Sequence, residues 1–274
     1  MSISSEMAAA LATAGPGQLR KHENFRSRFL PAERDLIVYL PGVYQKNPKL
    51  RFPVLYLQDG QNLFDPNTSF VPGMYWRVGE TADRLIQQGL IRPLVIIGIY
   101  NTGKRRIREY TPSRDKTRGG GGADRYGRML LEEIKPFIES EYRALTGPAN
   151  TGIGGSSLGG LLALYLGLQF AEVFGKMAVL SPSVWWDRRW ILKYVARLQV
   201  KSRPRIWLDV GTQEGGRTMD DVARLREILV EKGWQDRRDL HFQTFPGGQH
   251  NEASWAERVA PFLQFLFPAS DPAV

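Results

Sequence analysis

One short run, Pro93-Leu-Val-Ile-Ile-Gly-Ile-Tyr100, constrains the fold of this chain more than any other stretch. Between its ends it holds only apolar residues and one glycine, which is typical of a strand buried on both faces of a parallel sheet. Parallel strands need covering connections, and strand-like and helix-like segments alternate from residue 52 onward without repeats or a linker. The sequence therefore predicts one α/β domain with a doubly wound, mostly parallel sheet flanked by helices.

Apolar spacing divides the chain into the individual elements. The predicted strands cover residues 24–30, 35–40, 51–57, 93–100, 176–180, 205–210 and 240–245. The predicted helices cover residues 78–89, 123–142, 161–170 and 190–198, a segment opened by a Thr218-x-x-Asp221 capping box, and residues 255–267. We expect residues 23–269 to form the domain, residues 1–22 to form a poorly ordered tail, and residues 270–274 to form a second tail.

Residues 101–122 form a long glycine-rich segment with neither a helical nor a strand period, so they are expected to be a lid or a mobile loop. Much of the net charge of +9 falls there, on Lys104, Arg105, Arg106, Arg108, Arg114, Lys116 and Arg118. No helix-turn-helix, zinc finger or aromatic RNA-binding signature accompanies these cations. We therefore expect no nucleic-acid partner.

Composition excludes several kinds of site. The chain has no cysteine, which excludes disulfides and thiolate chemistry, and its three histidines are too few and too scattered for a metal centre. No apolar run approaches the length of a membrane span, so no membrane partner is expected. The first residues lack a basic region before an alanine-rich patch, which makes a poor secretory signal and favours a cytoplasmic location. The oligomeric state is left open.

The strongest motif is Gly155-Ser156-Ser157-Leu158-Gly159, which fits G-x-S-x-G with Ser157 at its centre. This pattern describes a sharp strand-to-helix turn that exposes a serine hydroxyl over the carboxyl end of a sheet. Ser156 does not fit, because Leu158 would then occupy the second glycine position. A chance glycine-rich turn is one alternative. A phosphate-binding loop is another, although no Gly-Lys-Ser/Thr follows.

A nucleophilic serine needs a base and an acid, and two later loops offer them. His250 follows the last predicted strand, whereas His241 lies inside that strand and His22 lies in the expected tail, so His250 is the predicted general base. Glu214 follows the preceding strand and is the predicted acid that orients the imidazole. Asp209 is less favoured because it lies within a strand, where a carboxylate is costly to bury.

The acidic pair Asp220 and Asp221 is also less favoured, since both residues open a helix. The order Ser157, Glu214, His250 is that of α/β-hydrolases. An oxyanion hole needs two backbone N–H groups. We assign one to Leu158, the residue after the nucleophile, and the other to Gln61, which follows the Asp59-Gly60 turn after the third strand.

These features together resemble the esterase D/enterochelin-esterase-like family of α/β-hydrolases, over about residues 24–267. That family includes ferric-enterobactin, feruloyl and acetyl-xylan esterases, S-formylglutathione hydrolases and mycolyltransferases. The segments that carry the resemblance are Val54–Asp65, Arg108–Pro112, Gly154–Gly160, Ser181–Asp187, Gly211–Glu214 and Gly247–His250. The family's nucleophile, acid, base and oxyanion amide fall on Ser157, Glu214, His250 and Gln61. Many members have Asp at the acid position, and some siderophore esterases lack the acid.

The resemblance implies a serine carboxylesterase that acts through an acyl-enzyme on small or aromatic esters, with no cofactor and no metal. An acyltransferase or a siderophore trilactone esterase is the alternative within enzymes. A catalytically silent module that binds a ligand or nucleic acid is the alternative outside them. Tyr110, Trp76 and Trp186 lie on segments that the family places around the pocket, as do Tyr75 and Trp185, and the first three are the predicted substrate-binding residues.

Overall fold

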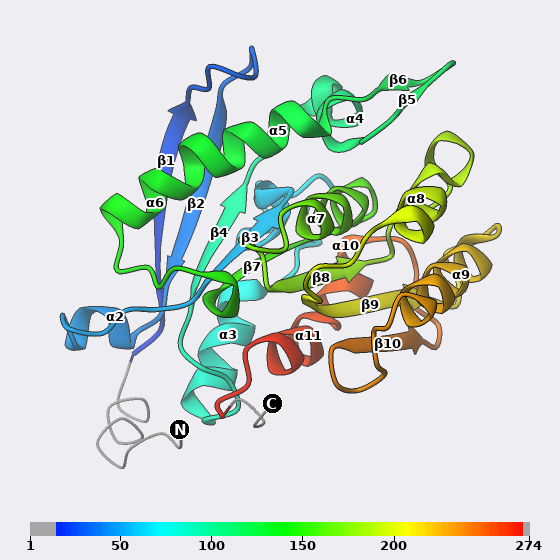
Figure 1. Ribbon diagram of the computed structural model, residues 1–274. Helices are drawn as coiled ribbons and strands as arrows, with labels where there is room; N and C mark the ends of the chain where they lie inside the picture. The colour runs from blue at the N-terminus through cyan, green and yellow to red at the C-terminus, as the bar shows by residue number, and fades with distance from the viewer. Residues whose placement is uncertain (1–14, 271–274) are drawn as a thin grey trace.

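The computed structural model describes residues 15–270, which form an eight-stranded sheet in the order β1-β2-β4-β3-β7-β8-β9-β10 (Figure 1). Its strands are β1 (Gln18–Phe25), β2 (Arg34–Leu40), β3 (Val54–Gln58), β4 (Val95–Ile99), β7 (Thr151–Ser156), β8 (Lys176–Leu180), β9 (Arg205–Gly211) and β10 (Leu240–Phe245). Within this sheet, only the β1–β2 and β2–β4 pairs are antiparallel. The remaining pairs are parallel, which confirms the predicted α/β fold class.

The helices lie on both faces of this sheet. The longer ones are α3 (Val78–Gln87), α5 (Ala123–Met129) continuing through η3 (Leu130–Ile134) into α6 (Lys135–Glu141), α7 (Leu158–Gln169), α8 (Trp186–Arg197), α9 (Thr218–Glu231) and α11 (Val259–Leu266). The chain moves one way from β3 through α3 to β4, and the other way from β7 to β10. Because such crossovers are right-handed, α3 lies on the opposite face from α7. Figure 1 shows α3 beside α11, with which it packs.

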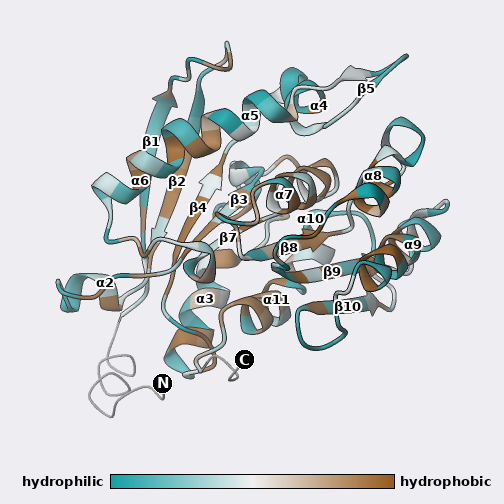
Figure 2. Ribbon diagram, in the orientation of Figure 1, coloured by the Kyte–Doolittle hydropathy of each residue, from teal (hydrophilic) through white to brown (hydrophobic). Residues whose placement is uncertain are grey.

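The centre of the core is made by elements without a polar face. All residues of β3 and β4 are buried, and so is every residue of α7 except Gln169. A helix that is apolar all round is stable only when its neighbours cover it, and α7 packs on β7 and β8 (Figure 2). Because its neighbours cover it, helix α7 is rigid and fixes the position of its first residue, Leu158, which directly follows the predicted nucleophile.

The expected N-terminal tail ends earlier than predicted. Residues 1–14 and 271–274 lie outside the described part of the chain, but Gln18–Phe25 forms β1, antiparallel to β2 at the edge of the sheet. The boundary at residue 22 is therefore wrong, and His22 lies in a strand, with its Nε2 2.6 Å from the hydroxyl of Tyr142. The strand escaped prediction because its residues are mostly exposed and its sequence, QLRKHENF, lacks an apolar alternation.

The basic segment 101–122 is structured rather than a simple loop. It contains η2 (Gly103–Arg105), α4 (Arg106–Tyr110) and a hairpin of β5 (Arg114–Asp115) and β6 (Gly119–Gly120). A buried ion pair anchors α4, because the Arg34 guanidinium lies 3.1 Å from the Glu109 carboxylate and neither side chain is more than 3% exposed. The sequence of the segment itself could not reveal this ion pair, because Arg34 lies in β2, outside residues 101–122.

The predicted capping box of α9 is not formed. Arg217 is the N-cap residue, and no side chain caps this helix. Asp221 instead pairs with Arg189 of α8, at 2.6 Å. Within residues 15–270, no helix has both the length and the apolar character that crossing a membrane requires.

Candidate active site

The candidate site lies where the chain direction through the sheet reverses. β3 and β7 are neighbours, yet the chain leaves β3 toward one edge and β7 toward the other, so the loops at their carboxyl ends diverge. Such switch points are where open α/β sheets bind ligands. A pocket of about 290 Å³ opens here, and its lining includes Asp59, Gln61, Ser157, His250, Glu252 and Trp255.

Ser157 occupies a strained turn between β7 and α7. Its φ of 57° and ψ of −123° lie in a region that L-residues rarely adopt. Three backbone hydrogen bonds of 3.0 Å hold it there. Its N–H donates to the carbonyl of Leu180, and its carbonyl accepts from the N–H groups of Ser183 and Leu161. The turn also requires Gly155, because a Cβ at that position would lie 2.9 Å from the carbonyl carbon of Gly159. The G-x-S-x-G pattern thus has a steric basis.

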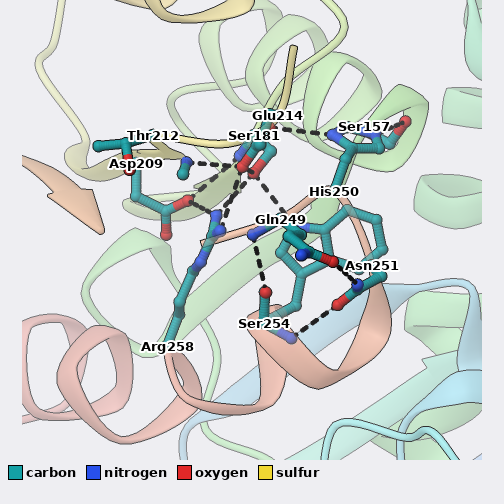
Figure 3. Close-up of polar contacts among 12 residues, drawn as sticks. Ser157, Ser181, Asp209, Thr212, Glu214, Gln249, His250, Asn251, Ser254 and Arg258 are labelled. Carbon is teal, nitrogen blue, oxygen red and sulfur yellow. Dashed lines mark hydrogen bonds and ion pairs between the residues drawn. The ribbon is translucent and has the colours of Figure 1, made fainter. Parts of the chain in front are cut away.

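Three predicted residues from three loops meet in one chain of hydrogen bonds (Figure 3). The Nε2 of His250 lies 2.9 Å from the Oγ of Ser157, and its Nδ1 lies 2.9 Å from the Oε2 of Glu214. The His250 loop is itself fixed, since Asn251 caps α10 (Glu252–Ala256) by accepting a hydrogen bond from the N–H of Ser254. This arrangement allows the imidazole to take a proton from the hydroxyl while the carboxylate holds the other nitrogen.

Glu214 is held as an anion by several donors. Burial alone raises the pKa of its carboxyl, but hydrogen bonds from His250, the Ser181 hydroxyl and the Gly211 N–H outweigh burial and bring the pKa below its ordinary value. The Ser181 and Gly211 contacts are 2.5 and 2.6 Å long. The side chain is fully buried, and the guanidinium of Arg258 lies 3.1 Å away. An ionised, immobile Glu214 suits the orientation of an imidazole.

Asp209, the less favoured acid, does not reach His250. Its side chain points inward from the strand and is fully buried. Arg258, the N-cap residue of α11, forms an ion pair with it at 2.8 Å (Figure 3). The indole of Trp207 also donates to it, at 2.7 Å. Burial raises the pKa of Asp209 to about 6, against the influence of Arg258. Asp209 and Glu214 therefore share one buried cation.

The two predicted oxyanion donors are the backbone amides of Leu158 and Gln61. Leu158 is the first residue of α7, and Gln61 lies in η1 (Gly60–Asn62), directly after β3. The first N–H groups of a helix have no partner within it. Among the described residues, neither of these two N–H groups has a backbone or side-chain acceptor. Neither amide is therefore committed to an acceptor within residues 15–270.

The three aromatic residues predicted to bind substrate do not reach the pocket. Tyr110, Trp76 and Trp186 are 0%, 1% and 2% exposed, and none of them lines it. Their large apolar surfaces gain more from burial in the core than from exposure at a pocket wall. The prediction of direct substrate contact is therefore corrected for all three. Tyr75 does not line the pocket either, and its hydroxyl donates to Glu80.

The buried aromatics instead support residues that do line the pocket. The Trp76 ring lies 6.0 Å from that of Trp255, which in turn meets the His250 ring edge to face at 5.0 Å. The Tyr110 hydroxyl accepts a hydrogen bond from the N–H of Asp59, at 3.2 Å. Trp255 escaped prediction as a pocket residue because the sequence indicates only that it begins a helix.

Two further pairs in the pocket also escaped prediction. Arg106 binds the carboxylate of Asp59 through two contacts of 2.7 Å, across the turn after β3. Glu252 accepts a hydrogen bond of 3.2 Å from the side chain of Asn62, which links the Gln61 loop to the His250 loop. Burial raises the pKa of Glu252. The only sequence signals were the Asp59-Gly60 turn and the position of Glu252 two residues after His250.

Known proteins match this chain over most of its length. A family model described as "Putative esterase" matches residues 27–266. The chain is 26% identical to the uncharacterized protein YbbA of Bacillus subtilis, over 92% of this chain and 96% of that protein. It is 31% identical to the ferri-bacillibactin esterase BesA of the same organism, over 74% of this chain and 75% of BesA.

Among solved structures, the fold is similar to that of an IroE-like serine hydrolase from Shewanella oneidensis. The TM-score is 0.72 at 23% identity, over 92% of this chain and 80% of that one. The fold and the family matches together place the chain among ester hydrolases. The chain belongs to the Putative esterase family, in the enterochelin-esterase-like group of α/β-hydrolases that its motifs resemble.

Proposed function

We propose that this protein is a serine carboxylesterase whose nucleophile is Ser157, whose general base is His250 and whose acid is Glu214. The observation that carries the proposal is the hydrogen-bonded chain of these three side chains, with contacts of 2.9 Å on each side of the imidazole. The strained backbone of Ser157 adds support, because this conformation presents the hydroxyl above the sheet.

The proposed reaction has two steps. In the first, the Oγ of Ser157 attacks the ester carbonyl while His250 takes its proton, and the protonated imidazole then gives that proton to the departing alcohol. In the second, His250 takes a proton from water, the hydroxide attacks the acyl-enzyme, and the carboxylic acid leaves as Ser157 regains its proton. Glu214 remains ionised and stabilises the positively charged imidazole in both steps.

The N–H groups of Leu158 and Gln61 are proposed to bind the oxygen of the tetrahedral intermediate. They come from loops after neighbouring parallel strands, so they approach Ser157 from two sides. Preorganised donors of this kind stabilise the charge that develops in the transition state. The bidentate Asp59–Arg106 pair beside Gln61 keeps the second loop in place.

The proposed substrates are small or aromatic esters. The pocket of about 290 Å³ lies at the lower end of the usual size for ligand sites, and Phe70, Val71 and Trp255 give it apolar walls. Siderophore ester hydrolysis is a second candidate, which the 31% identity to a ferri-bacillibactin esterase supports. Assays with short-chain p-nitrophenyl esters, feruloyl esters and a catecholate trilactone distinguish these substrates.

Hydrolysis of p-nitrophenyl acetate tests the proposed function. The unmodified protein is expected to release p-nitrophenolate, and Ser157→Ala is expected to lower kcat by about 10⁴-fold or more, because the nucleophile is lost. Ser183→Ala is the matched control, since its hydroxyl lies 3.3 Å from that of Ser157 but outside the proposed triad. An active Ser157→Ala variant contradicts the proposal, as does a protein without turnover of any ester in the panel.

A further inference from the structure

A second cleft lies apart from the Ser157 pocket, between the β5–β6 hairpin and the start of α8. It has a volume of about 490 Å³, and its lining includes Arg114, Lys116, Arg118, Trp185, Asp187 and Arg188. In Figure 1 the hairpin extends beyond α4, with the first turn of α8 below it. The proposed reaction uses none of these residues.

The cleft is positively charged. Four cations line it, Arg114, Lys116, Arg118 and Arg188, against the two carboxylates of Asp115 and Asp187. In the described part of the chain, Arg118 is the only one of the four cations with a carboxylate within 4.0 Å. The other three cations have no carboxylate partner there and are free to meet an anion from solution.

One of the two carboxylates, that of Asp115, already accepts hydrogen bonds within the hairpin. Asp115 accepts hydrogen bonds from the backbone N–H groups of Arg118, at 2.8 Å, and Thr117, at 2.9 Å. These bonds lower its pKa and close the turn at the tip of the hairpin. Asp115 is thus held in its ionised form by the turn, and the four cations of the cleft still outnumber its two carboxylates.

An exposed aromatic face accompanies the cations. Trp185 is 43% exposed, whereas its neighbour Trp186 is buried. The guanidinium of Arg118 lies 5.5 Å from the centre of the Trp185 ring. An aromatic ring that enters the cleft can stack on this indole while an anionic substituent meets the cations.

The chain segment that carries Trp185 passes beside the proposed nucleophile. The hydroxyl of Ser183 lies 3.3 Å from that of Ser157, and Trp185 follows Ser183 by two residues. Two residues of chain span at most about 7 Å. The Cα of Trp185 therefore lies within about 7 Å of the Cα of Ser183, whose hydroxyl is beside that of Ser157.

The walls of the cleft are joined to each other. The indole N–H of Trp186 donates to the carbonyl of Ser113 at 3.0 Å, and the N–H of Gly121 donates to the hydroxyl of Thr111 at 3.0 Å. Gly120 packs directly against α8, because a Cβ there would lie 2.7 Å from the Trp186 ring. The base of the hairpin is thus fixed on α8, and a preformed cleft binds with less loss of entropy.

We propose that this cleft is a binding subsite for an aromatic ring that carries a carboxylate, as part of an ester whose scissile bond lies at Ser157. The subsite deepens the proposed esterase function and rests on it for the role of the bound group. The indole of Trp185 stacks on the ring, and Lys116, Arg118 and Arg188 bind the carboxylate. Esters with such an anionic aromatic part are bound more tightly than their neutral counterparts.

Binding without turnover tests the subsite itself. In Ser157→Ala protein, 4-hydroxycinnamate is expected to quench tryptophan fluorescence, whereas its neutral amide, 4-hydroxycinnamamide, has little effect. Trp185→Phe in the same background is expected to remove most of the quenching. Raising the salt concentration from about 0.05 M to about 0.5 M shortens the range of charge interactions and is expected to weaken binding of the anion only. Equal quenching by both compounds, or quenching that survives Trp185→Phe, overturns the proposal.

Kinetics then test the contribution of the subsite to specificity. The substrates are 4-acetoxycinnamate and its neutral amide, which share one scissile bond. A Lys116→Glu, Arg118→Glu variant is expected to raise KM for the anionic ester by about tenfold or more and to leave the neutral amide within about twofold. The control carries the same charge change at Lys49→Glu, Lys201→Glu, two exposed positions before β3 and β9 at the other end of the sheet.

The two tests separate the proposals. Anion-selective quenching without hydrolysis of any ester supports the subsite and contradicts the esterase function. Hydrolysis in which the two substrates respond equally to the charge reversal overturns the subsite and leaves the esterase function intact. A loss of KM discrimination in the control variant also overturns the subsite, because the effect would then come from net charge alone.

Discussion

Replacing His250 with alanine is expected to lower kcat for p-nitrophenyl acetate by about 10⁴- to 10⁶-fold, because no other group takes the proton of Ser157. The imidazole is the only titratable side chain within hydrogen-bond distance of that hydroxyl among residues 15–270, at 2.9 Å. Its partial exposure predicts a small effect on folding. The measurement is steady-state turnover, with circular dichroism as the check on the fold.

His241→Ala is the matched control for this loss. His241 lies in β10, stacks on the ring of Trp207 at 4.6 Å and does not line the pocket. Its removal is expected to leave kcat within about twofold, since surface-strand substitutions act on stability rather than on a distant site. Comparable losses in the two variants would contradict the role of His250 as base.

Replacing Arg258 with methionine is expected to cost about 3–5 kcal/mol of folding free energy, which is the usual cost of removing one partner from a buried ion pair. The guanidinium is fully buried and contacts both Asp209 and Glu214. Without it, two buried carboxylates lose their shared cation. Urea unfolding measures the loss, and Arg224→Met, at an exposed arginine of α9, serves as the control with a change of at most about 1 kcal/mol.

The loss of folding free energy in Arg258→Met is expected to depend on pH. The pKa of Asp209 is already raised to about 6 by burial, and it rises further when the guanidinium that favours the charged form is gone. A carboxyl whose pKa is higher in the folded state than in the unfolded state holds its proton more tightly in the folded protein. As pH rises through the folded-state pKa, that proton is lost and the stability of the folded state falls. The destabilisation is therefore expected to be smaller at about pH 5 than at about pH 8.

A second substitution separates this electrostatic cost from lost packing. In an Asp209→Asn, Arg258→Met double variant, the amide side chain would carry no charge, and its oxygen would still accept the hydrogen bond from the N–H of Ser181. The double variant is expected to be more stable at about pH 8 than the sum of the single changes indicates. Strict additivity would mean that the arginine stabilises the fold mainly through its packing.

The sequence indicated which three loops meet at the candidate site, for a physical reason. Loops after neighbouring parallel strands meet at one edge of a sheet, so Ser157, Glu214 and His250 could be brought together from chain order alone. The buried strands β3 and β4 and the helix α7 were equally predictable, because their apolar runs leave few alternatives.

Features that depend on distant partners escaped prediction. The edge strand β1 is mostly exposed and is placed by its pairing with β2, so its side chains carry no apolar period. The partners of Arg258 lie in other parts of the chain, and local sequence does not reveal which carboxylate a helical arginine meets. The aromatic residues Tyr110, Trp76 and Trp186 lie on the predicted segments, but only packing determined that their rings point into the core.

Covalent labelling with a fluorophosphonate tests the central claim most directly, because the probe forms a bond with an activated serine oxygen and releases fluoride. Mass spectrometry of the peptide spanning residues 144–176 is expected to place one adduct on Ser157. The label is expected to persist in Ser156→Ala, whose side chain is buried at the end of β7, and to be absent in Ser157→Ala and strongly reduced in His250→Ala. An adduct on Ser156, or one that survives in Ser157→Ala, would contradict the assignment of Ser157 as the nucleophile.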